Sequence, residues 1–407
     1  MIDRLRALLG DAAVRPARPG EAAHGMAAGA VVEPDGADAC AALLGTCSTE
    51  GWTVEVAGGR TGGDRGRPVE RVDVLLSTAR LSGVAEYEPD DLTIGVAGGT
   101  TLAELRARVN ANRQRVPLDP PSDRATVGGV LARAAAGPMR LAWSTPRRQT
   151  LGIELVTGDG RILRVGGRVV KNVAGYDLNK LVVGSAGTLG VITRAHLRLL
   201  PVPAAAATTT VESASVPTLA QTARALLGDS VQPAALELVG PPWRLIARYE
   251  GAAEAVQAGL SAVRAAAAET AVARDDGAIE RLASVESDAA LVLRLADLPD
   301  RLEQTIERAA ALAAQDAVLA AHVADGIVRV LVPRASAGSV RAAELGAAIA
   351  SARGSFGGTI AVERAGAELM RMVDPWGTLP EPVMRITRDL KRQFDPAGIL
   401  QRGRWLA

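Results

Sequence analysis

The first 200 residues alternate short apolar runs of period two with amphipathic helical repeats. Gly36–Glu50 carries apolar residues at helical spacing, and the alternating run Thr53–Ala57 that follows it predicts a strand. Thr101 stands directly before a second helical pattern and is a suitable N-cap. The remaining elements are expected at Val31–Val32, Val72–Ser77, Gly83–Glu88, Leu92–Ala97, Leu102–Asn112, Ile153–Thr157, Arg161–Val165 and Val191–Leu200. Of these, Ile153–Thr157 and Arg161–Val165 are predicted to form a hairpin around Gly158-Asp159-Gly160. We interpret residues 31–200 as one α+β domain that begins with a β-α-β unit.

Beyond Ala204 the pattern changes to strands that alternate with alanine-rich amphipathic helices. Ala204–Thr210 is low in complexity and is interpreted as a linker or the approach to a strand. Strands are expected at Ala235–Val239, Arg244–Tyr249, Ala289–Leu295 and Ile327–Pro333, and helices at Ala253–Thr270, Asp300–Ala314 and Gly338–Ala352. This order is typical of a sheet with helices on one face. A last helix is expected at Pro382–Phe394.

Composition narrows the range of functions. The 407 residues exceed one small core and favour two domains. With 46 basic and 45 acidic residues the net charge is +1, so no global field attracts nucleic acid or an anionic membrane. Cys40 and Cys47 are two helical turns apart, too far for a disulfide, and no cysteine–histidine cluster predicts an iron–sulfur or zinc site. No apolar stretch of about 18 residues occurs, which favours a cytoplasmic location.

Glycine-rich segments carry the candidate chemistry. Gly58–Gly63 follows the strand Thr53–Ala57, and a series of segments rich in glycine and small hydroxyl residues lies between Ser122 and Pro203. These are Thr126–Gly129, Ser144–Arg147, Lys171–Leu178 and Gly184–Ile192. Because glycine has no Cβ, such backbone approaches a large phosphate-bearing ligand closely. A single pair such as Gly98-Gly99 is interpreted as a turn, but two loops joined by this pattern indicate FAD.

The same residues resemble a known family. Residues 31–200 are similar to the FAD-binding domain of the vanillyl-alcohol oxidase and p-cresol methylhydroxylase (PCMH) type. Gly166–Leu178, running into Gly184–Gly190, is most similar to the smaller FAD-binding subunit of bacterial glycolate oxidase (glycolate dehydrogenase). Phe394–Leu400 resembles the closing segment of that family. The resemblance covers the first half of the chain well, the middle loosely and the tail recognisably.

The resemblance implies an α+β fold in several parts. A PCMH-type FAD-binding domain of two α+β subdomains would be followed by an α+β antiparallel-sheet cap domain, and the C-terminal tail would return to the FAD domain. The expected boundaries are an N-terminal arm at 1–30, the FAD-binding domain at 31–203, the cap or substrate domain at 204–375, and the closing helix and segment at 376–407.

The resemblance also implies which residues hold a non-covalent FAD. Backbone amides of Gly58–Gly63 would surround the pyrophosphate. Thr126 would donate its hydroxyl, and Val191 and Ile192 would face the adenine. Thr145 and Arg147 would lie near the ribose or pyrophosphate. The complete set of expected cofactor-binding residues is Gly58, Gly59, Arg60, Thr61, Gly62, Gly63, Ser122, Thr126, Val127, Gly128, Gly129, Thr145, Arg147, Gly187, Gly190, Val191 and Ile192.

Two regions depart from the family pattern. Relatives that oxidise 2-hydroxy acids carry a histidine-rich Gly-Asp-Gly-Asn motif in the second domain, of which this chain keeps only His322 and Asp325-Gly326. We expect His322 to be an exposed histidine at a strand entry, with a remnant of that site as the alternative. In the tail, Gln401 stands where the family has an asparagine near the flavin. Gln401 would replace it, or Arg402 or Arg404 would supply positive charge to the flavin.

Other positions in the motifs have structural alternatives. Arg60 stands where the family often has a glycine, and it either contacts a phosphate or faces solvent. Lys171, Asn172 and Tyr176 would lie near the domain interface. For Lys171 we favour an ion pair with Asp177, and for Tyr176 a packed aromatic side chain.

The resulting hypothesis is an FAD-binding subunit of a heteromeric 2-hydroxy-acid (glycolate) dehydrogenase that takes part in electron transfer to an acceptor. The resemblance implies a larger catalytic FAD subunit and an iron–sulfur subunit as partners, with membrane contact only through them. One alternative is a self-sufficient FAD oxidoreductase of another hydroxy acid or alcohol, with substrate arginines drawn from Arg244, Arg248, Arg294 and Arg329. Another is a non-catalytic assembly subunit. No residue is identified as the catalytic base.

Overall fold

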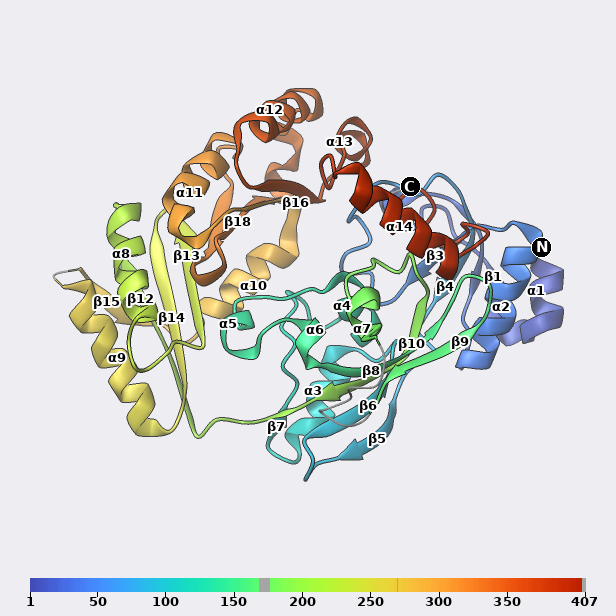
Figure 1. The fold of residues 1–407 in the computed structure, drawn as a ribbon, viewed down its shortest axis with the longest axis horizontal. Helices are drawn as coiled ribbons and strands as arrows, with labels where there is room; N and C mark the ends of the chain where they lie inside the picture. The colour runs from blue at the N-terminus through green and yellow to red at the C-terminus, as the bar shows by residue number, and fades with distance from the viewer. Residues whose placement is uncertain (168–175, 269, 405–407) are drawn as a thin grey trace. The chain divides into compact units, whose positions relative to one another are not determined.

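The computed structural model describes residues 1–167, 176–268 and 270–404 (Figure 1). Contacts between residues divide the chain into two compact units. Unit 1 comprises Met1–Ala136, Thr145–Val202 and Leu379–Ala407, and unit 2 comprises Gly137–Ser144 and Pro203–Thr378. These units differ from the expected domains because the first 30 residues belong to unit 1 and Gly137–Ser144 groups with unit 2.

The first sheet of unit 1 is built around a parallel β-α-β arrangement. Its elements are α1 Ile2–Leu9, β1 Val14–Pro16, β2 Ala28–Val32, α2 Ala37–Glu50, β3 Val54–Ala57 and β4 Val72–Ser77. The strand order is β1-β2-β4-β3, with β2, β4 and β3 parallel and β1 antiparallel to β2. Helix α2 packs Leu43 and Leu44 into one apolar cluster with the sheet. The predicted helix and strands of this region are therefore confirmed.

The N-terminal 30 residues are more regular than the expected arm. Val14 pairs with Val32 across β1 and β2, and Leu5 of α1 is fully buried in the cluster that α2 forms with the sheet. Pro16 ends β1, where a residue without an N–H is tolerated at a sheet edge. Cys40 and Cys47 are both free thiols, and burial raises the pKa of each to about 12.

The second sheet of unit 1 is antiparallel. Its main elements are β5 Val84–Glu88, β6 Thr93–Ala97, α3 Leu102–Asn110, α4 Val127–Arg133, β8 Thr150–Val156, β9 Ile162–Gly166 and β10 Val191–Arg198, in the strand order β5-β6-β10-β8-β9. The predicted hairpin is confirmed as β8–β9. Thr101 caps α3 as expected: its hydroxyl accepts from the Glu104 amide at 3.2 Å, and the Glu104 carboxylate accepts from the Thr101 amide at 2.9 Å.

The C-terminal tail completes unit 1. Helix α14, Glu381–Phe394, is followed by a segment that pairs with β3, since the Val54 amide donates to the Ile399 carbonyl at 2.8 Å and the Gln401 amide to the Val54 carbonyl at 2.9 Å. Shorter elements of unit 1 are β7 Gln114–Arg115, α6 Pro146–Gln149, α7 Asn179–Val182 and β11 Leu200–Pro201. The tail thus returns to the FAD-binding fold, as the resemblance implied.

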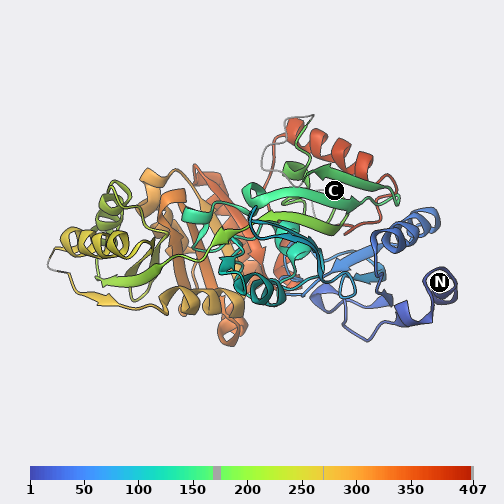
Figure 2. The same cartoon turned by 90° about the horizontal axis from the view of Figure 1, so that it is seen from below.

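Unit 2 is one eight-stranded antiparallel sheet with helices packed on it (Figure 2). Its strand order is β15-β12-β14-β13-β17-β18-β16-β19. The strands are β12 Ala205–Glu212, β13 Ala235–Gly240, β14 Arg244–Gly251, β15 Val272–Arg274, β16 Ala289–Ala296, β17 Val318–His322, β18 Ile327–Pro333 and β19 Thr359–Arg364. The helices are α5 Arg140–Trp143, α8 Val216–Leu227, α9 Ala253–Ala267, α10 Ala278–Asp288, α11 Leu302–Ala311, α12 Ala342–Ser355 and α13 Ala367–Met372.

The helices of unit 2 cover both faces of the sheet, unequally. Helices α8, α9, α11 and α12 pack on one face with Leu238, Leu293 and Val330. Helix α10 packs with Val239, Val292 and other alternate strand positions, which face the opposite side. The expectation of helices on a single face is therefore wrong for α10. The segment Ala204–Thr210, interpreted as a linker or the approach to a strand, leads into and forms most of β12, which pairs with both β14 and β15.

The segment Gly137–Ser144 joins unit 2 through two specific contacts. The Arg140 guanidinium pairs with the Asp325 carboxylate at 2.7 Å, and the Ala142 amide donates to the Ala234 carbonyl at 3.2 Å. Met139 packs with Ala234 and Ala235 of β13 in a small apolar cluster. Through these contacts the segment packs on the sheet of unit 2, although the residues before and after it in the sequence belong to unit 1.

Candidate cofactor site

A cavity of about 370 Å³ lies within unit 1. Its lining comes from the loop after β3, the start of α4, the turn before β10, the segment before β2 and the C-terminal tail. The expected cofactor-binding residues that the structure brings together here are Gly58, Gly59, Arg60, Thr61, Gly62, Gly63, Thr126, Gly128, Gly129, Gly187, Gly190, Val191 and Ile192. Segments separated by more than 100 positions in the sequence thus share one cavity, although their contact with FAD stays a prediction.

Four expected residues lie outside this lining: Ser122, Val127, Thr145 and Arg147. Val127 is fully buried in the apolar core behind the cavity. The Arg147 guanidinium donates to the Val183 carbonyl at 3.0 Å, and the Ser122 hydroxyl accepts from the Arg124 amide at 3.3 Å. Thr145 is the N-cap residue of α6. The side chains of Val127, Arg147 and Ser122 therefore have packing or hydrogen-bonding roles within the chain, whereas Thr145 makes no side-chain capping hydrogen bond to α6.

The loop Gly58–Gly63 offers unused backbone donors to the cavity. Within the part of the chain that the structure describes, the N–H groups of Gly58, Gly59, Gly62 and Gly63 make no hydrogen bond. A Cβ on Gly62 would lie 1.1 Å from Nη1 of Arg133, which shows that the arginine guanidinium rests directly on the loop. Successive free amides beside a cationic group form an anion-binding nest.

Thr126 lines the cavity, and its hydroxyl has a structural role in the chain. It is the N-cap of α4, and its Oγ1 accepts from the Gly129 amide at 3.3 Å. The same oxygen lies against Gly58, where an added Cβ would be 2.2 Å away. Thr126 therefore joins the loop to the start of α4. Donation of its hydroxyl to FAD stays a prediction.

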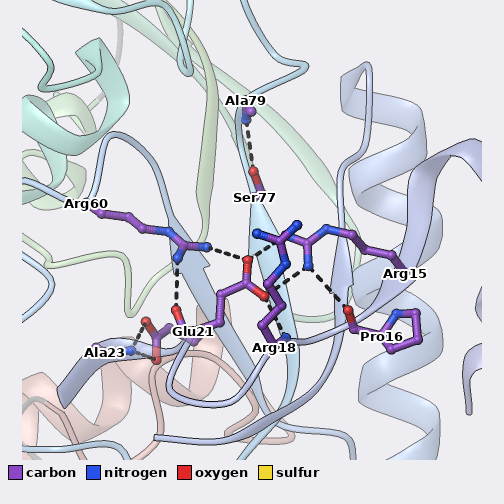
Figure 3. Close-up of polar contacts among 9 residues, drawn as sticks. Arg15, Pro16, Arg18, Glu21, Ala23, Arg60, Ser77 and Ala79 are labelled. Carbon is purple, nitrogen blue, oxygen red and sulfur yellow. Dashed lines mark hydrogen bonds and ion pairs between the residues drawn. The ribbon is translucent and has the colours of Figure 1, made fainter. Parts of the chain in front are cut away.

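Arg60 lies in the cavity lining with a side chain that is 43% exposed, and its guanidinium reaches the N-terminal segment (Figure 3). Its guanidinium donates to the Glu21 carbonyl at 3.0 Å and lies 3.6 Å from the Glu21 carboxylate. Glu21 also accepts from Arg15 at 2.5 Å and from the Arg18 amide at 2.8 Å. The Arg15 hydrogen bond is the main cause that lowers the pKa of Glu21 to about 2. Arg60 thus ties the glycine loop to residues before β2.

Several cavity residues were not expected from the motifs. Glu55 of β3, Arg133 of α4 and His24 all line the cavity. Glu55 is only 4% exposed, and both of its carboxylate oxygens accept from the Ala23 amide, at 3.0 and 3.3 Å. A glutamate inside the apolar run Val54–Ala57 was the available sequence signal, because such a strand position faces either the core or a ligand.

The tail supplies two further polar residues of the cavity. Gln401 has a φ of 50°, and its Nε2 donates to the Val56 carbonyl at 3.3 Å. Arg404 is 7% exposed and lines the same cavity. Arg402 instead points to Glu70, 3.6 Å away, with a side chain that is 57% exposed. Of the tail residues considered for the flavin, Gln401 and Arg404 therefore reach the cavity and Arg402 does not.

The family motif at residues 166–178 is only partly within the described residues. Lys171 and Asn172 lie outside them. Asp177 pairs with Lys180 at 3.4 Å. The Tyr176 side chain is 96% exposed, so the expectation of a packed aromatic is wrong.

His322 occupies a buried polar cluster in unit 2 rather than an exposed position. It ends β17 and is 6% exposed, and strand register places it beside Glu237 of β13. Its Nδ1 lies 2.6 Å from Oε1 of Glu237, and its Nε2 lies 3.2 Å from Nη1 of Arg329. The expectation of an exposed strand-entry histidine is therefore wrong, because pairing of β13 with β17 encloses the side chain.

The hydrogen bonds of His322 define its protonation. An arginine N–H is only a donor, so Nε2 must accept and the ring proton must lie on Nδ1, facing Glu237. Burial, followed by the charges of Arg329 and Arg140, lowers the pKa of His322 to about 3. Burial also raises the pKa of Glu237 well above its ordinary value. The histidine is thus neutral, with both ring nitrogens engaged.

The arginines considered as substrate ligands are mostly paired within unit 2. Arg248 donates to Glu250 at 2.9 Å, and Arg294 lies 3.3 Å from Glu363. Arg329 lies 3.4 Å from both Glu286 and Glu363. Arg244 begins β14.

The first part of the chain is similar in sequence to known FAD-binding proteins. Residues 28–166 match the family model described as FAD binding domain. The chain is 42% identical to glycolate oxidase subunit GlcE of Escherichia coli over 142 residues, which cover 34% of this chain and 40% of that protein. It is 36% identical to a D-lactate dehydrogenase of Archaeoglobus fulgidus over 171 residues, 42% of this chain and 38% of that protein. The chain thus matches less than half the length of these relatives.

Nearly the whole chain shares its fold with solved structures of other proteins. The structure of p-cresol methylhydroxylase with substrate bound superposes with a TM-score of 0.74 at 16% identity, covering 99% of this chain and 95% of the other. An alkyldihydroxyacetonephosphate synthase gives a TM-score of 0.74 at 15% identity, covering 98% of this chain and 84% of the other.

The matching family model and the similarity to glycolate oxidase subunit GlcE indicate FAD as the cofactor. The free amides of the glycine loop, together with the guanidinium groups of Arg133 and Arg404 in the same cavity, fit the diphosphate of such a cofactor. Residues 28–166 match the model of the FAD binding domain family, and the chain as a whole has the fold of p-cresol methylhydroxylase.

Proposed function

We propose that this chain is the FAD-binding subunit of a heteromeric 2-hydroxy-acid dehydrogenase, with glycolate as the substrate. The observation that carries the proposal is the cavity of unit 1, which is lined by a glycine loop whose backbone N–H groups have no hydrogen-bond acceptor within the described residues. The similarity to a glycolate oxidase subunit and to a D-lactate dehydrogenase supports a 2-hydroxy acid as the source of electrons.

The residues of this chain would hold and orient the cofactor. The Gly58–Gly63 amides would bind the diphosphate, and Val191 and Ile192 would enclose the adenine. Gln401, fixed through its Nε2 on the Val56 carbonyl, would direct Oε1 at a cofactor donor, since this oxygen has no hydrogen bond within the described residues. FAD itself supplies two-electron acceptance from the hydroxy acid.

A subunit role is favoured over independent catalysis by the state of His322. Removing the hydroxyl proton of a hydroxy acid requires a base with a free lone pair within hydrogen-bond reach. The one lone pair of the His322 ring is engaged by Arg329 at 3.2 Å. The chain would therefore relay electrons within an assembly that contains a larger catalytic FAD subunit and an iron–sulfur subunit.

The membrane association of such an assembly would depend on its partners. No helix among the described residues is long and apolar enough to cross a bilayer. The compartment we propose is the cytoplasm, or the inner face of the membrane by way of partner subunits.

The decisive experiment is an absorbance spectrum of the purified full-length chain between about 300 and 550 nm, the range of flavin absorption, before and after anaerobic addition of glycolate. We expect a flavin spectrum that persists with glycolate and bleaches once the larger subunit is added. Bleaching by the isolated chain would instead establish a self-sufficient dehydrogenase, the candidate favoured by its likeness to D-lactate dehydrogenase. A colourless chain that takes up no FAD would contradict both.

A further inference from the structure

The cofactor cavity is lined by a buried cation, Arg404, whose N–H donors are not all used by the protein. Arg404 is 7% exposed, and its Nε and Nη2 make no hydrogen bond within the described residues. A buried guanidinium with unused N–H groups is costly, because its lost hydration is not replaced. Because Arg404 lines the cavity, a ligand bound there could supply the hydrogen-bond acceptors that take the place of water.

The nearest anion is Glu55, but the geometry is that of a loose ion pair. Nη2 of Arg404 lies 3.9 Å from Oε2 of Glu55, beyond hydrogen-bond distance. The Glu55 carboxylate already accepts from the Ala23 amide. Glu55 therefore balances the charge of Arg404 without occupying its donors, which leaves the guanidinium available to a second anion.

Arg404 shares the cavity with other groups that suit a phosphate. Burial lowers the pKa of Arg404, and the carboxylates of Glu55 and Asp64, which stand on either side of the glycine loop in the sequence, oppose that shift. The Arg404 carbonyl accepts from the Arg67 amide at 3.3 Å, shortly after the loop. The Arg133 guanidinium rests on Gly62 of the same loop. Arg404, Arg133 and the free backbone amides of the glycine loop thus line the same cavity.

From this geometry we propose that Arg404 binds the diphosphate of FAD and that Glu55 is the positioning residue that holds its guanidinium in the cavity. The inference rests on the proposed function, because it assumes that FAD is the ligand. Bidentate donation from an arginine fork matches the oxygens of a phosphate group. The remaining charged and titratable groups near Glu55 are Arg60, Asp64 and His24.

The test measures ligand affinity of the flavin-free full-length chain by calorimetry, with FAD, ADP and riboflavin as three probes. ADP carries the diphosphate without the flavin, and riboflavin carries the flavin without a phosphate. For Arg404→Gln we expect the affinity for both FAD and ADP to fall by about 10- to 100-fold, as for loss of charge-assisted hydrogen bonds, with riboflavin unchanged. Arg402→Gln is the matched control, since its exposed side chain points to Glu70, and it should leave all three affinities within about twofold.

A second pair of variants separates ligand binding from stability. Arg404→Gln alone leaves Glu55 buried without its counter-ion, so its melting temperature should fall. In Glu55→Gln/Arg404→Gln no unpaired charge remains, so stability should recover while ADP affinity stays low. Recovery of ADP affinity together with stability would show that Arg404 acts only through the fold and would overturn the proposal.

Other outcomes are equally informative. If Arg404→Gln weakens riboflavin but spares ADP, the arginine serves the flavin ring and the proposal is wrong. If none of the three affinities changes, Arg404 does not contact the cofactor. Failure of the unmodified chain to bind FAD would contradict the proposed function itself, and that result is distinguishable because it appears before any substitution is made.

Discussion

The α-carbon of Gly59 lies directly against the backbone carbonyl of Arg124. A Cβ on Gly59 would be 1.9 Å from that oxygen, far inside contact distance, and the oxygen belongs to the backbone and cannot rotate away. This contact fixes the glycine loop against the segment that leads into α4, and with it the amides that we propose bind the diphosphate.

Gly59→Ala is therefore expected to displace the loop. We expect a loss of about 1 to 3 kcal/mol in the free energy of unfolding, as for overpacked sites, and weaker FAD binding by fluorescence titration. Gly354→Ala in α12 is the control, because its added Cβ would meet nothing within 4 Å and the residue lies outside the cavity lining. Equal effects of the two substitutions would contradict a specific role for the Gly59 contact.

The closing of the tail depends on the carboxylate of Asp395. This side chain is fully buried and accepts from the Ile399 amide at 3.1 Å, the Leu400 amide at 2.8 Å and the Lys391 ammonium at 2.5 Å. In Asp395→Asn an amide NH₂ would face one of these donors. We expect the free energy of unfolding in urea to fall by about 2 to 4 kcal/mol. Asp389→Asn, exposed on the same helix beside Arg392, should change it by less than about 0.5 kcal/mol.

The extent to which the sequence predicts this molecule depends on how local each feature is. The Thr101 cap, the β8–β9 hairpin and the helix α2 rest on neighbouring residues, and all are confirmed. The glycine loop was also found, because glycine pairs after a strand are a local signal.

Features that depend on long-range register were missed. His322 meets Glu237 from 85 positions away, through pairing of two strands of which only β13 was predicted. The Arg404–Glu55 pair joins the tail to β3, and no local pattern specifies which arginine of the tail turns inward. Arg60 was correctly marked as unusual, but its partner Glu21 lies in a segment interpreted as an irregular arm.

Glu21 should give the chain a measurable acid sensitivity. Its pKa is lowered from 4.5 to about 2, chiefly by the Arg15 hydrogen bond. A carboxyl with a lowered folded-state pKa contributes stability that is fully present above its unfolded value and is lost as the pH falls toward the folded value. The difference in unfolding free energy between wild type and Glu21→Gln should therefore be constant above pH 4.5 and shrink toward pH 2. A difference that does not change with pH would show that packing alone is responsible; Glu88→Gln, at an exposed position, is the control.

His322 should produce a separate effect at higher pH. Its pKa is lowered from 6.5 to about 3 by burial and by Arg329 and Arg140. Between these values the unfolded chain binds a proton that the folded chain does not. Stability is therefore greatest above pH 6.5 and falls as the pH decreases toward 3.

His322→Gln removes this titration while keeping a polar side chain in the cluster. Between pH 4 and pH 6, inside the interval from about 3 to 6.5, we expect the unfolding free energy of wild type to depend more steeply on pH than that of the variant. The expected difference approaches about 1.4 kcal/mol per pH unit, the value for one proton. Equal slopes would mean that His322 is protonated in the folded chain. Its Nε2 would then be unable to accept from Arg329, and the argument that this lone pair is engaged would fail.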